Sequence, residues 1–286
     1  MRGLPVAQRV RGAAFTALLS LCAGVSLTFL AIPIIALFAE APLGRIPGLF
    51  SDPVVREILA VTVRTNLISN ALILLLGTPT AYLLATRRFR GRSLAITLVE
   101  LPLVLPPAVA GIGLLAAFGA GGLLGDSLQE AGIFIPFTEW AVVLAITFVA
   151  SPFYVRQGIA SFEAVDPNLP AAARTLGASP ARTFLRVSMP LAAGGLAAGW
   201  VLAFARGVGE FGATIMFAGN VRGVTQTLTL GIYEQLEANF DLALAIGVLL
   251  VILSATVLLA YKLISSWRTS NSISNSRFQP SPSRSV

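Results

Sequence analysis

The hydrophobic positions of the chain gather in long runs that are separated by shorter polar connections. We interpret six of these runs as helices that cross a bilayer, which takes about 20 apolar residues each. They lie at 13–39, 61–86, 94–118, 140–155, 191–219 and 242–267. The first run is longer than the core of a secretion signal, about 7–15 residues, so we expect it to remain as a span. The pattern therefore predicts an all-α membrane protein with six transmembrane helices.

Composition agrees with a membrane protein and excludes several kinds of chemistry. Of the 286 residues 56% are hydrophobic and 12% are charged, whereas a soluble domain carries about a quarter charged residues. The chain has no histidine and a single cysteine, Cys22. It therefore lacks the commonest metal ligand and general base, which argues against an intramembrane hydrolase, and it has no disulfide framework.

The charged residues sort onto alternate connections between the six runs. Fifteen of the twenty basic residues lie before the first run, after the second, between the fourth and fifth, and at or beyond the end of the sixth. The other three connections hold nine of the thirteen acidic residues. Because cytoplasmic loops collect Lys and Arg, both termini are predicted to be cytoplasmic. Topology then accounts for the net charge of +7 without a nucleic-acid partner.

The runs and charges divide the chain into three parts. Residues 1–54 are expected to form an N-terminal transmembrane helix with an external loop, and residues 55–267 the core of the protein. Residues 268–286 are rich in Ser, Asn and Pro and are predicted to be a disordered cytoplasmic tail.

One cytoplasmic connection, residues 160–190, forms what we call the basic module, and it contains the sequence AAARTLGASPARTFLRVSMP. Its spacing predicts a first short helix with one apolar face, made of Leu169, Ala172, Ala173 and Leu176. Gly177 stands where a helix ends in a left-handed residue. Ser179 and Pro180 give a cap followed by a first-turn proline, so a second short helix is predicted to begin there.

Two interpretations of the basic module follow from its residues alone. Arg182 and Arg186 share a face of the second helix, and arginine is attracted to anionic lipid, so the module could lie as a hairpin on the headgroups of membrane lipid. Alternatively, its apolar faces could form a docking knob for a cytoplasmic partner.

The spacing of the module also resembles the cytoplasmic loop signature of binding-protein-dependent ABC importer permeases. That signature runs Glu-Ala-Ala, three residues, Gly, nine residues, Ile, one residue and Leu-Pro. The matching positions are Ala171, Ala172, Ala173, Gly177, Val187, Met189 and Pro190. Alanine at 171 replaces the usual glutamate, and Val187 and Met189 replace Ile and Leu. Three further stretches are similar to molybdate permeases: LGTPTAYLLATRRFRGR, LPLVLPPAVAGIGLL and GEFGATIMFAGN.

The resemblance implies the type I ABC importer (MetI-like) permease fold. It implies a second copy of the chain, two cytoplasmic ABC ATPase subunits and an external oxyanion-binding protein as partners, and molybdate as the transported substrate. Sulfate and tungstate permeases are the alternatives. The implied ATPase-docking loop consists of Ala171, Ala172, Ala173, Leu176, Gly177, Arg182 and Pro190. No cofactor is expected on this chain, and ATP would bind the partner ATPase. Indeed the only lysine, Lys262, follows Tyr261, so the chain has no P-loop.

Ionisable groups inside a span are costly and point to function or to pairing. Arg206 and Glu210 lie four residues apart in the fifth run, so we expect them to pair, either as a structural ion pair or as part of the translocation path or gate. Pro106 and Pro107 break the third run, and a broken helix is tolerated only against protein or a water-filled cavity. These prolines are therefore also predicted to line the path. A proton-coupled carrier is the alternative class, although Glu210 is the only central carboxylate.

Three weaker predictions concern packing. Arg64 is expected to reach the headgroups. Asn66 and Asn70 are expected to bond between helices. A stripe of small residues is predicted to form a helix-packing surface, at Gly195, Gly199, Ala203 and Gly207.

Overall fold

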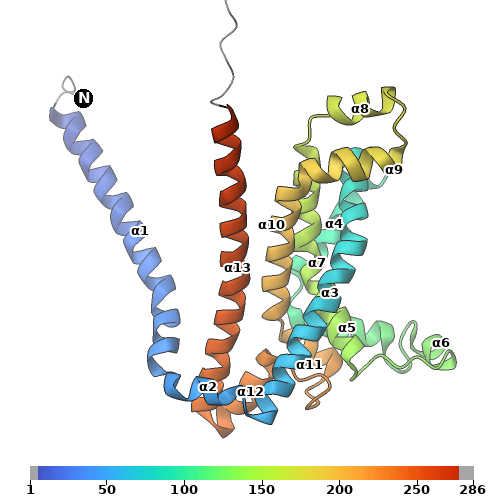
Figure 1. Ribbon diagram of the computed structural model, residues 1–286. Coiled ribbons are helices and arrows are strands. Elements are labelled where there is room, and N and C mark those ends of the chain that lie inside the picture. Colours follow the sequence, from blue (N-terminus) through green and yellow to red (C-terminus); the bar gives the residue numbers. More distant parts are fainter. Residues whose placement is uncertain (1–5, 277–286) are drawn as a thin grey trace, which may run out of the picture.

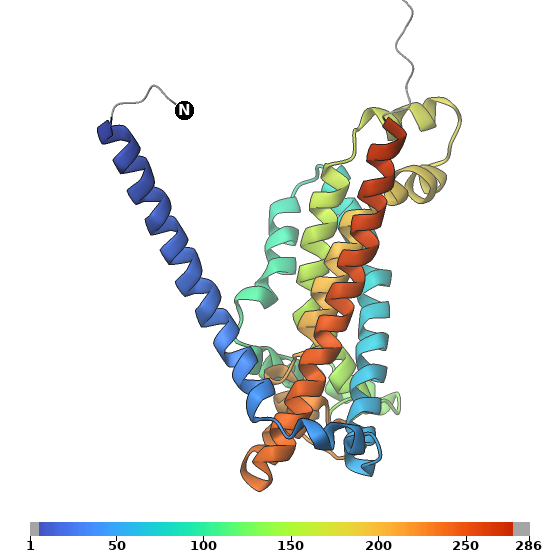
Figure 2. The ribbon, with the colours of Figure 1, turned by 60° about the vertical axis from the view of Figure 1, so that its left-hand side comes forward.

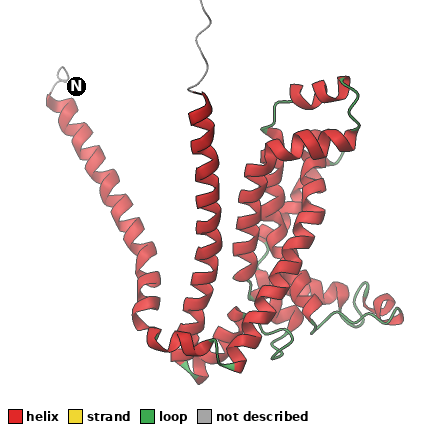
Figure 3. Cartoon of the chain, viewed as in Figure 1, coloured by secondary structure: helices red, strands yellow, loops and turns green. Residues whose placement is uncertain are grey.

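The computed structural model describes residues 6–276, and every regular element in that range is helical (Figure 3). Inside a bilayer a helix satisfies its own backbone N–H and C=O groups, which explains why apolar runs of this length fold as helices. Five helices are long and apolar enough to span a membrane. They are α1 (Val6–Glu40), α3 (Pro53–Thr86), α7 (Glu139–Glu163), α10 (Met189–Val208) and α13 (Phe240–Ser276).

The sixth predicted span is a bent pair of helices. Helix α4 (Arg92–Val104) and helix α5 (Pro107–Phe118) meet at an angle of 117°. Proline lacks a backbone N–H and clashes with the preceding turn, and it also disfavours helical geometry in the residue before it. Two consecutive prolines, Pro106 and Pro107, therefore end α4 and begin α5. The prediction of a span broken by prolines is confirmed.

Helices α3, α7 and α10 form the centre of the bundle, and α5 and α11 (Gly212–Ala218) pack against it. The small residues of α10 allow its backbone to approach α7 closely. A Cβ at Gly199 would lie 2.9 Å from the Cβ of Gln157, and a Cβ at Gly207 would lie 2.8 Å from Ile146. Ala203 is completely buried. The predicted small-residue stripe is thus confirmed as a packing surface.

Helix α1 stands away from this bundle and leans toward it only at one end (Figure 1, Figure 2). None of the most apolar window of α1 is buried within the chain, and its one substantial neighbour is α13. A Cβ at Gly247 of α13 would lie 3.3 Å from Leu37, which marks their contact. The remaining apolar surface of α1 is free to meet lipid or another protein.

Short helices close the end of the bundle where α1 joins α3. They are the 3-10 turn η1 (Leu43–Arg45), α2 (Ile46–Leu49), α6 (Gly125–Glu130), α11 and α12 (Leu228–Ala238), and Figure 1 shows them at the lower end. Asp52 caps the start of α3, because its Oδ1 accepts a hydrogen bond from the Val54 N–H at 2.8 Å.

The opposite end carries the basic module, which consists of α8 (Asn168–Thr175), α9 (Pro180–Thr183) and the segment that follows α9. The start of α1 and the end of α13 lie at this same end in both views (Figure 1, Figure 2). The alternating charges predicted that these parts share one side of the bundle, and the cytoplasmic location of that side stays a prediction.

Two predicted boundaries are wrong. The fifth run was expected to be one span over 191–219, but α10 ends at Val208 and α11 starts at Gly212 as a separate helix. The tail was expected to be disordered from 268, yet α13 continues through Ser276. Residues 277–286 of the predicted tail lie outside the described part of the chain.

Candidate functional site

The first helix of the basic module forms where its sequence predicts a short helix. Just before it, the Oδ1 of Asp166 accepts a hydrogen bond from the Asn168 N–H at 2.9 Å. Pro167 directly precedes the first helical residue. Arg174 lies in the last turn, where a positive charge stabilises the helix dipole.

Gly177 and Ser179 make the bend between the two helices. Gly177 has a φ of +85°, the left-handed conformation predicted for it, and a Cβ there would meet open space. The Ser179 side chain then accepts a hydrogen bond from the Arg182 N–H at 3.3 Å, which caps α9. Both predicted turn signals are therefore present in the structure.

The second helix of the module is continuous with the fifth span, which the sequence did not predict. After α9 the chain forms a π-helical turn, Phe184–Ser188, in which the Met189 N–H donates to the Phe184 carbonyl, and then runs directly into α10. Pro190 cannot donate a hydrogen bond to the preceding turn, and a π-helical register accommodates that loss. Figure 1 shows α9 lying across the end of the bundle while α10 runs along it.

The apolar face of the module is divided between the bundle and the exterior. Phe184 packs on Tyr82 of α3 with ring centroids 4.6 Å apart, which attaches the second helix to the bundle. Leu176, in contrast, is 88% exposed at the bend. Ala171, Ala172, Arg182 and Pro190 are also exposed, and Ala173 is half-buried. The predicted docking residues thus lie together at one end of the chain, and one large apolar side chain among them lacks cover.

Toward the end of the bundle opposite the basic module, the break between α4 and α5 lies against the break between α10 and α11 (Figure 1). A Cβ at Gly212, the first residue of α11, would lie 2.8 Å from the Cβ of Pro107. A Cβ at Gly111 of α5 would lie 2.6 Å from the Ala213 carbonyl oxygen. The backbones of α5 and α11 therefore touch at two glycines, and Pro106 and Pro107 remain exposed on the surface of the chain.

Arg206 and Glu210 pair across the break between α10 and α11. Oε2 of Glu210 lies 2.7 Å from Nη1 of Arg206. This is an ion contact and not an aligned hydrogen bond, since Oε2 has no hydrogen-bond partner among the described residues. Oε1 accepts a hydrogen bond from the Ala213 N–H at 2.7 Å and so caps α11. The predicted pair is present, although α10 ends between its two members.

The two side chains of this pair differ in exposure, and the difference separates their roles. The Glu210 side chain is 1% exposed and is used by contacts within the chain, whereas the Arg206 side chain is 27% exposed. The guanidinium therefore keeps N–H donors available at the surface of the chain. Such a group attracts and binds an oxyanion, because arginine presents several donors and a permanent positive charge.

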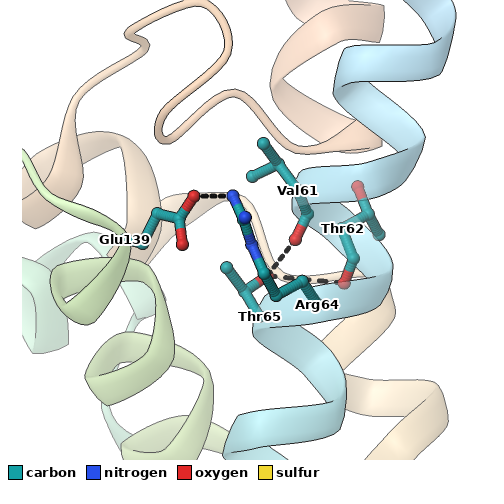
Figure 4. A network of polar contacts seen from close by, with 5 residues as sticks. All are labelled: Val61, Thr62, Arg64, Thr65 and Glu139. Atoms are coloured by element: carbon teal, nitrogen blue, oxygen red, sulfur yellow. Dashed lines mark hydrogen bonds and ion pairs between the residues drawn. The ribbon is translucent and has the colours of Figure 1, made fainter.

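Other polar groups of the spans form contacts that the sequence predictions missed. Arg64 pairs with Glu139 at the start of α7 (Figure 4). Asn66 and Asn70 donate to backbone carbonyls of their own helix, those of Thr62 and Asn66, so the prediction of bonds between helices is wrong. Glu139 opens α7 and Arg64 lies in α3. Their opposite charges were the signal in the sequence that could have predicted this ion pair.

The sequence matches a known protein family over most of its length. Residues 73–269 match the family described as the inner membrane component of binding-protein-dependent transport systems. The molybdenum transport system permease protein ModB of Mycobacterium bovis is 45% identical over 235 residues, which is 82% of this chain and 88% of that protein. The sulfate transport system permease protein CysT of Synechococcus elongatus is 36% identical over 240 residues, covering 82% and 86% of the two chains.

A solved structure has the same fold. The structure of a bacterial ABC transporter involved in the import of the acidic polysaccharide alginate matches 90% of this chain and 96% of its own, with a TM-score of 0.68 and 19% sequence identity. The predicted fold of an ABC importer permease is therefore confirmed.

Proposed function

Because the chain belongs to the family of inner membrane components of binding-protein-dependent transport systems, we propose that it is the permease subunit of an ATP-driven molybdate importer. It is a multi-pass integral membrane protein. Its sequence identity to a molybdenum transport permease supports molybdate as the proposed substrate. In this proposal two copies of the chain form the translocation path, two ATPase subunits bind ATP on the cytoplasmic side, and an external binding protein delivers the anion.

The basic module would receive the ATPase subunits. Its bend presents Leu176 at 88% exposure, which is an unusual position for a large apolar side chain unless a partner or lipid covers it. Gly177 shapes the bend, and its open surroundings leave room for a partner surface to close over it. The exposed docking residues named above would form the remainder of this contact.

The translocation path would pass the two helix breaks. The Arg206 guanidinium would offer donors to a tetrahedral dianion, and Glu210 would hold the guanidinium in place while reducing its positive charge. This arrangement favours transient contact over tight capture, since conduction requires that an ion also leave each site. Pro106 and Pro107 would expose backbone to the same path.

Transport by reconstituted components tests the importer proposal. We expect vesicles that contain the permease, its ATPase and its binding protein to accumulate molybdate when ATP is supplied on the ATPase side. Dissipating the proton gradient should have no effect, and omitting the ATPase should abolish uptake. Uptake that persists without the ATPase and stops when the gradient is dissipated would instead identify a proton-coupled carrier.

Competition between anions for uptake distinguishes molybdate from sulfate as the substrate. Sulfate is the second candidate because the chain is also similar in sequence to a sulfate permease. We expect tungstate to compete with molybdate uptake in these vesicles and sulfate to compete far more weakly. Uptake of sulfate in preference to molybdate would refute the proposed substrate while leaving the importer proposal in place.

A matched pair of variants tests the docking surface. Leu176→Asp places a charge at the bend, and Leu123→Asp places the same charge on an equally exposed leucine, 90% exposed, in the loop between α5 and α6. We expect Leu176→Asp to weaken pull-down of the ATPase and Leu123→Asp to leave it unchanged. Normal pull-down and coupling in Leu176→Asp would exclude the bend from the ATPase contact.

A further inference from the structure

A basic cleft of about 980 Å³ lies between the turn that joins α3 to α4 and the first helix of the basic module. Four arginines line it, three from the turn and the start of α4 and one from the last turn of α8. They are Arg87, Arg88, Arg92 and Arg174. Its lining includes neither Leu176 nor the residues of the helix breaks, and it shares one residue, Ala171, with the proposed docking residues.

Only one of the four arginines is neutralised within the described part of the chain. Arg92 donates to the Leu84 carbonyl at 2.7 Å and to Glu163 at 2.9 Å, and Glu163 is the one acidic residue in the lining. Arg87, Arg88 and Arg174 have no ion pair among the described residues. The cleft therefore keeps an excess of about three positive charges, which an anionic ligand would balance.

The walls of the cleft are suited to a ligand that is both anionic and apolar. Its floor includes Tyr82 and Phe162, whose rings meet edge to face with centroids 5.2 Å apart. Phe89 at its rim is 44% exposed, and Leu94 on the adjoining helix is 64% exposed. Helix α4 has no buried residue at all, so an apolar, uncovered surface continues from the cleft along the membrane span.

From this combination we propose that the cleft binds the headgroup of an anionic phospholipid, with its phosphate on the arginines and its acyl chains along α3 and α4. Basic pockets beside the cytoplasmic ends of transmembrane helices are suited to such headgroups, and a headgroup with two phosphates matches three free guanidiniums better than one with a single phosphate. A free phosphate would satisfy the arginines but would leave the apolar rim uncovered.

Such a lipid would fix the basic module against the bundle. Helix α8 packs mainly on α9 and the π-helical turn, and Figure 1 shows it held out at the end of the molecule. A phosphate between Arg174 of α8 and Arg87 or Arg88 of the α3–α4 turn would connect α8 to the span directly. Lipid binding by the cleft does not depend on the proposed function. An effect of the lipid on coupling to the ATPase would depend on the proposed function.

Lipid binding by the purified full-length permease tests the proposal, with mass spectrometry of the intact protein after equilibration with defined lipids. The probes are cardiolipin, phosphatidylglycerol and phosphatidylcholine. We expect retention in that order, and inorganic phosphate at millimolar concentration should not displace cardiolipin. Equal retention of cardiolipin and phosphatidylcholine, or ready displacement by phosphate, would overturn the proposal.

Variants locate the site. Each arginine near an anionic headgroup contributes roughly fivefold in affinity, so Arg87→Gln with Arg88→Gln should weaken cardiolipin binding about 30-fold. The control is Arg186→Gln, an exposed arginine of the module that does not line the cleft, and it should bind as the parent protein does. Equal binding by the double variant and the control would overturn the proposal.

A second variant adds charge without removing any side chain that the fold uses. Ala171 lines the cleft and carries no charge, so Ala171→Glu should place a carboxylate among the arginines, fold normally and weaken cardiolipin binding about fivefold or more.

If the arginine variants keep their lipid but fail to pull down the ATPase in lipid-free detergent, the cleft serves an acidic protein surface and the lipid proposal is wrong. Loss of lipid with intact ATP-driven transport would leave the proposed function standing.

Discussion

Replacing Glu210 by alanine removes two contacts at the break between α10 and α11. The Ala213 N–H loses its acceptor at 2.7 Å, and the Arg206 guanidinium loses the carboxylate at the same distance. The Glu210 side chain is 1% exposed, so no water replaces either contact without rearrangement. Both ends of the break are therefore affected by one substitution.

The free-energy cost follows from these two contacts. Loss of a helix cap costs about 1 kcal/mol. Removing one partner of a buried ion pair costs about 3–5 kcal/mol, and the lower end applies because Arg206 remains 27% exposed. The total, about 4 kcal/mol, lowers the folding equilibrium constant roughly a thousandfold. Arg206→Ala should cost a similar amount, because it leaves the Glu210 carboxylate, 1% exposed, without its counter-charge, while the hydrogen bond from the Ala213 N–H remains.

Thermal unfolding of the purified permease in one detergent is the measurement. We expect Glu210→Ala to lower the unfolding temperature and Glu210→Gln to lie between it and the parent, because glutamine keeps an acceptor oxygen. The double variant Arg206→Ala, Glu210→Ala should be more stable than the sum of the two single effects predicts, because it leaves no unpaired charge. Strict additivity would show that the two side chains do not stabilise each other.

Uptake by the same variants separates the structural role from the transport role. Arg206→Lys keeps the charge but loses the fork of donors, so we expect molybdate uptake between those of the parent and Arg206→Ala, with ATPase assembly intact. Normal uptake by both Arg206 variants would exclude the path role. Failure of both to assemble would leave a structural ion pair as the only role.

Three further substitutions test the packing and the bend. Gly111→Ala should lower the free energy of unfolding by about 1–3 kcal/mol through overpacking, because its Cβ would lie 2.6 Å from the Ala213 carbonyl oxygen. Gly113→Ala in the same helix meets open space and should be neutral. Gly199→Ala should likewise destabilise and its control Gly194→Ala should not. Gly177→Val should cost about 1–2 kcal/mol of backbone strain, reduce ATPase binding and leave membrane insertion unaffected. Full coupling of ATP hydrolysis to uptake in this variant would contradict the role of the bend.

Local signals predicted the elements that depend on local chemistry. The span positions follow from apolar runs, and the module's bend follows from a glycine and a serine-proline pair, because each of these residues limits the backbone where it stands. The π-helical continuation from α9 into α10 was not predicted. Pro190 and the half-buried Phe184 both bear on it, and Phe184 packs on Tyr82, which is far away in the sequence.

The contacts of the candidate site depend on tertiary structure to a greater degree. The four-residue spacing of Arg206 and Glu210 predicted their pairing, yet it assumed one helix, and the cap on Ala213 exists only because that helix ends. The approach of α5 to α11 through Gly111 and Gly212 joins segments about a hundred residues apart, and no local pattern encodes it. The basic cleft likewise needs the α3–α4 turn and α8 to meet.

The continuity of α9 with α10 connects the module to the ion pair. Helix α10, 20 residues long, spans about 30 Å, so a displacement at Ser179 would reach Arg206 through one continuous helix with a single bend at the π-helical turn. Glu210 is held differently: its carboxylate caps α11, and its carbonyl accepts a hydrogen bond from Thr229 of α12 at 2.6 Å. Rotation of α10 at the bend would therefore move the guanidinium relative to a carboxylate that other helices hold in place. In the proposed complex, the ion pair would lie where a helix that the ATPase moves meets a cap that other helices hold.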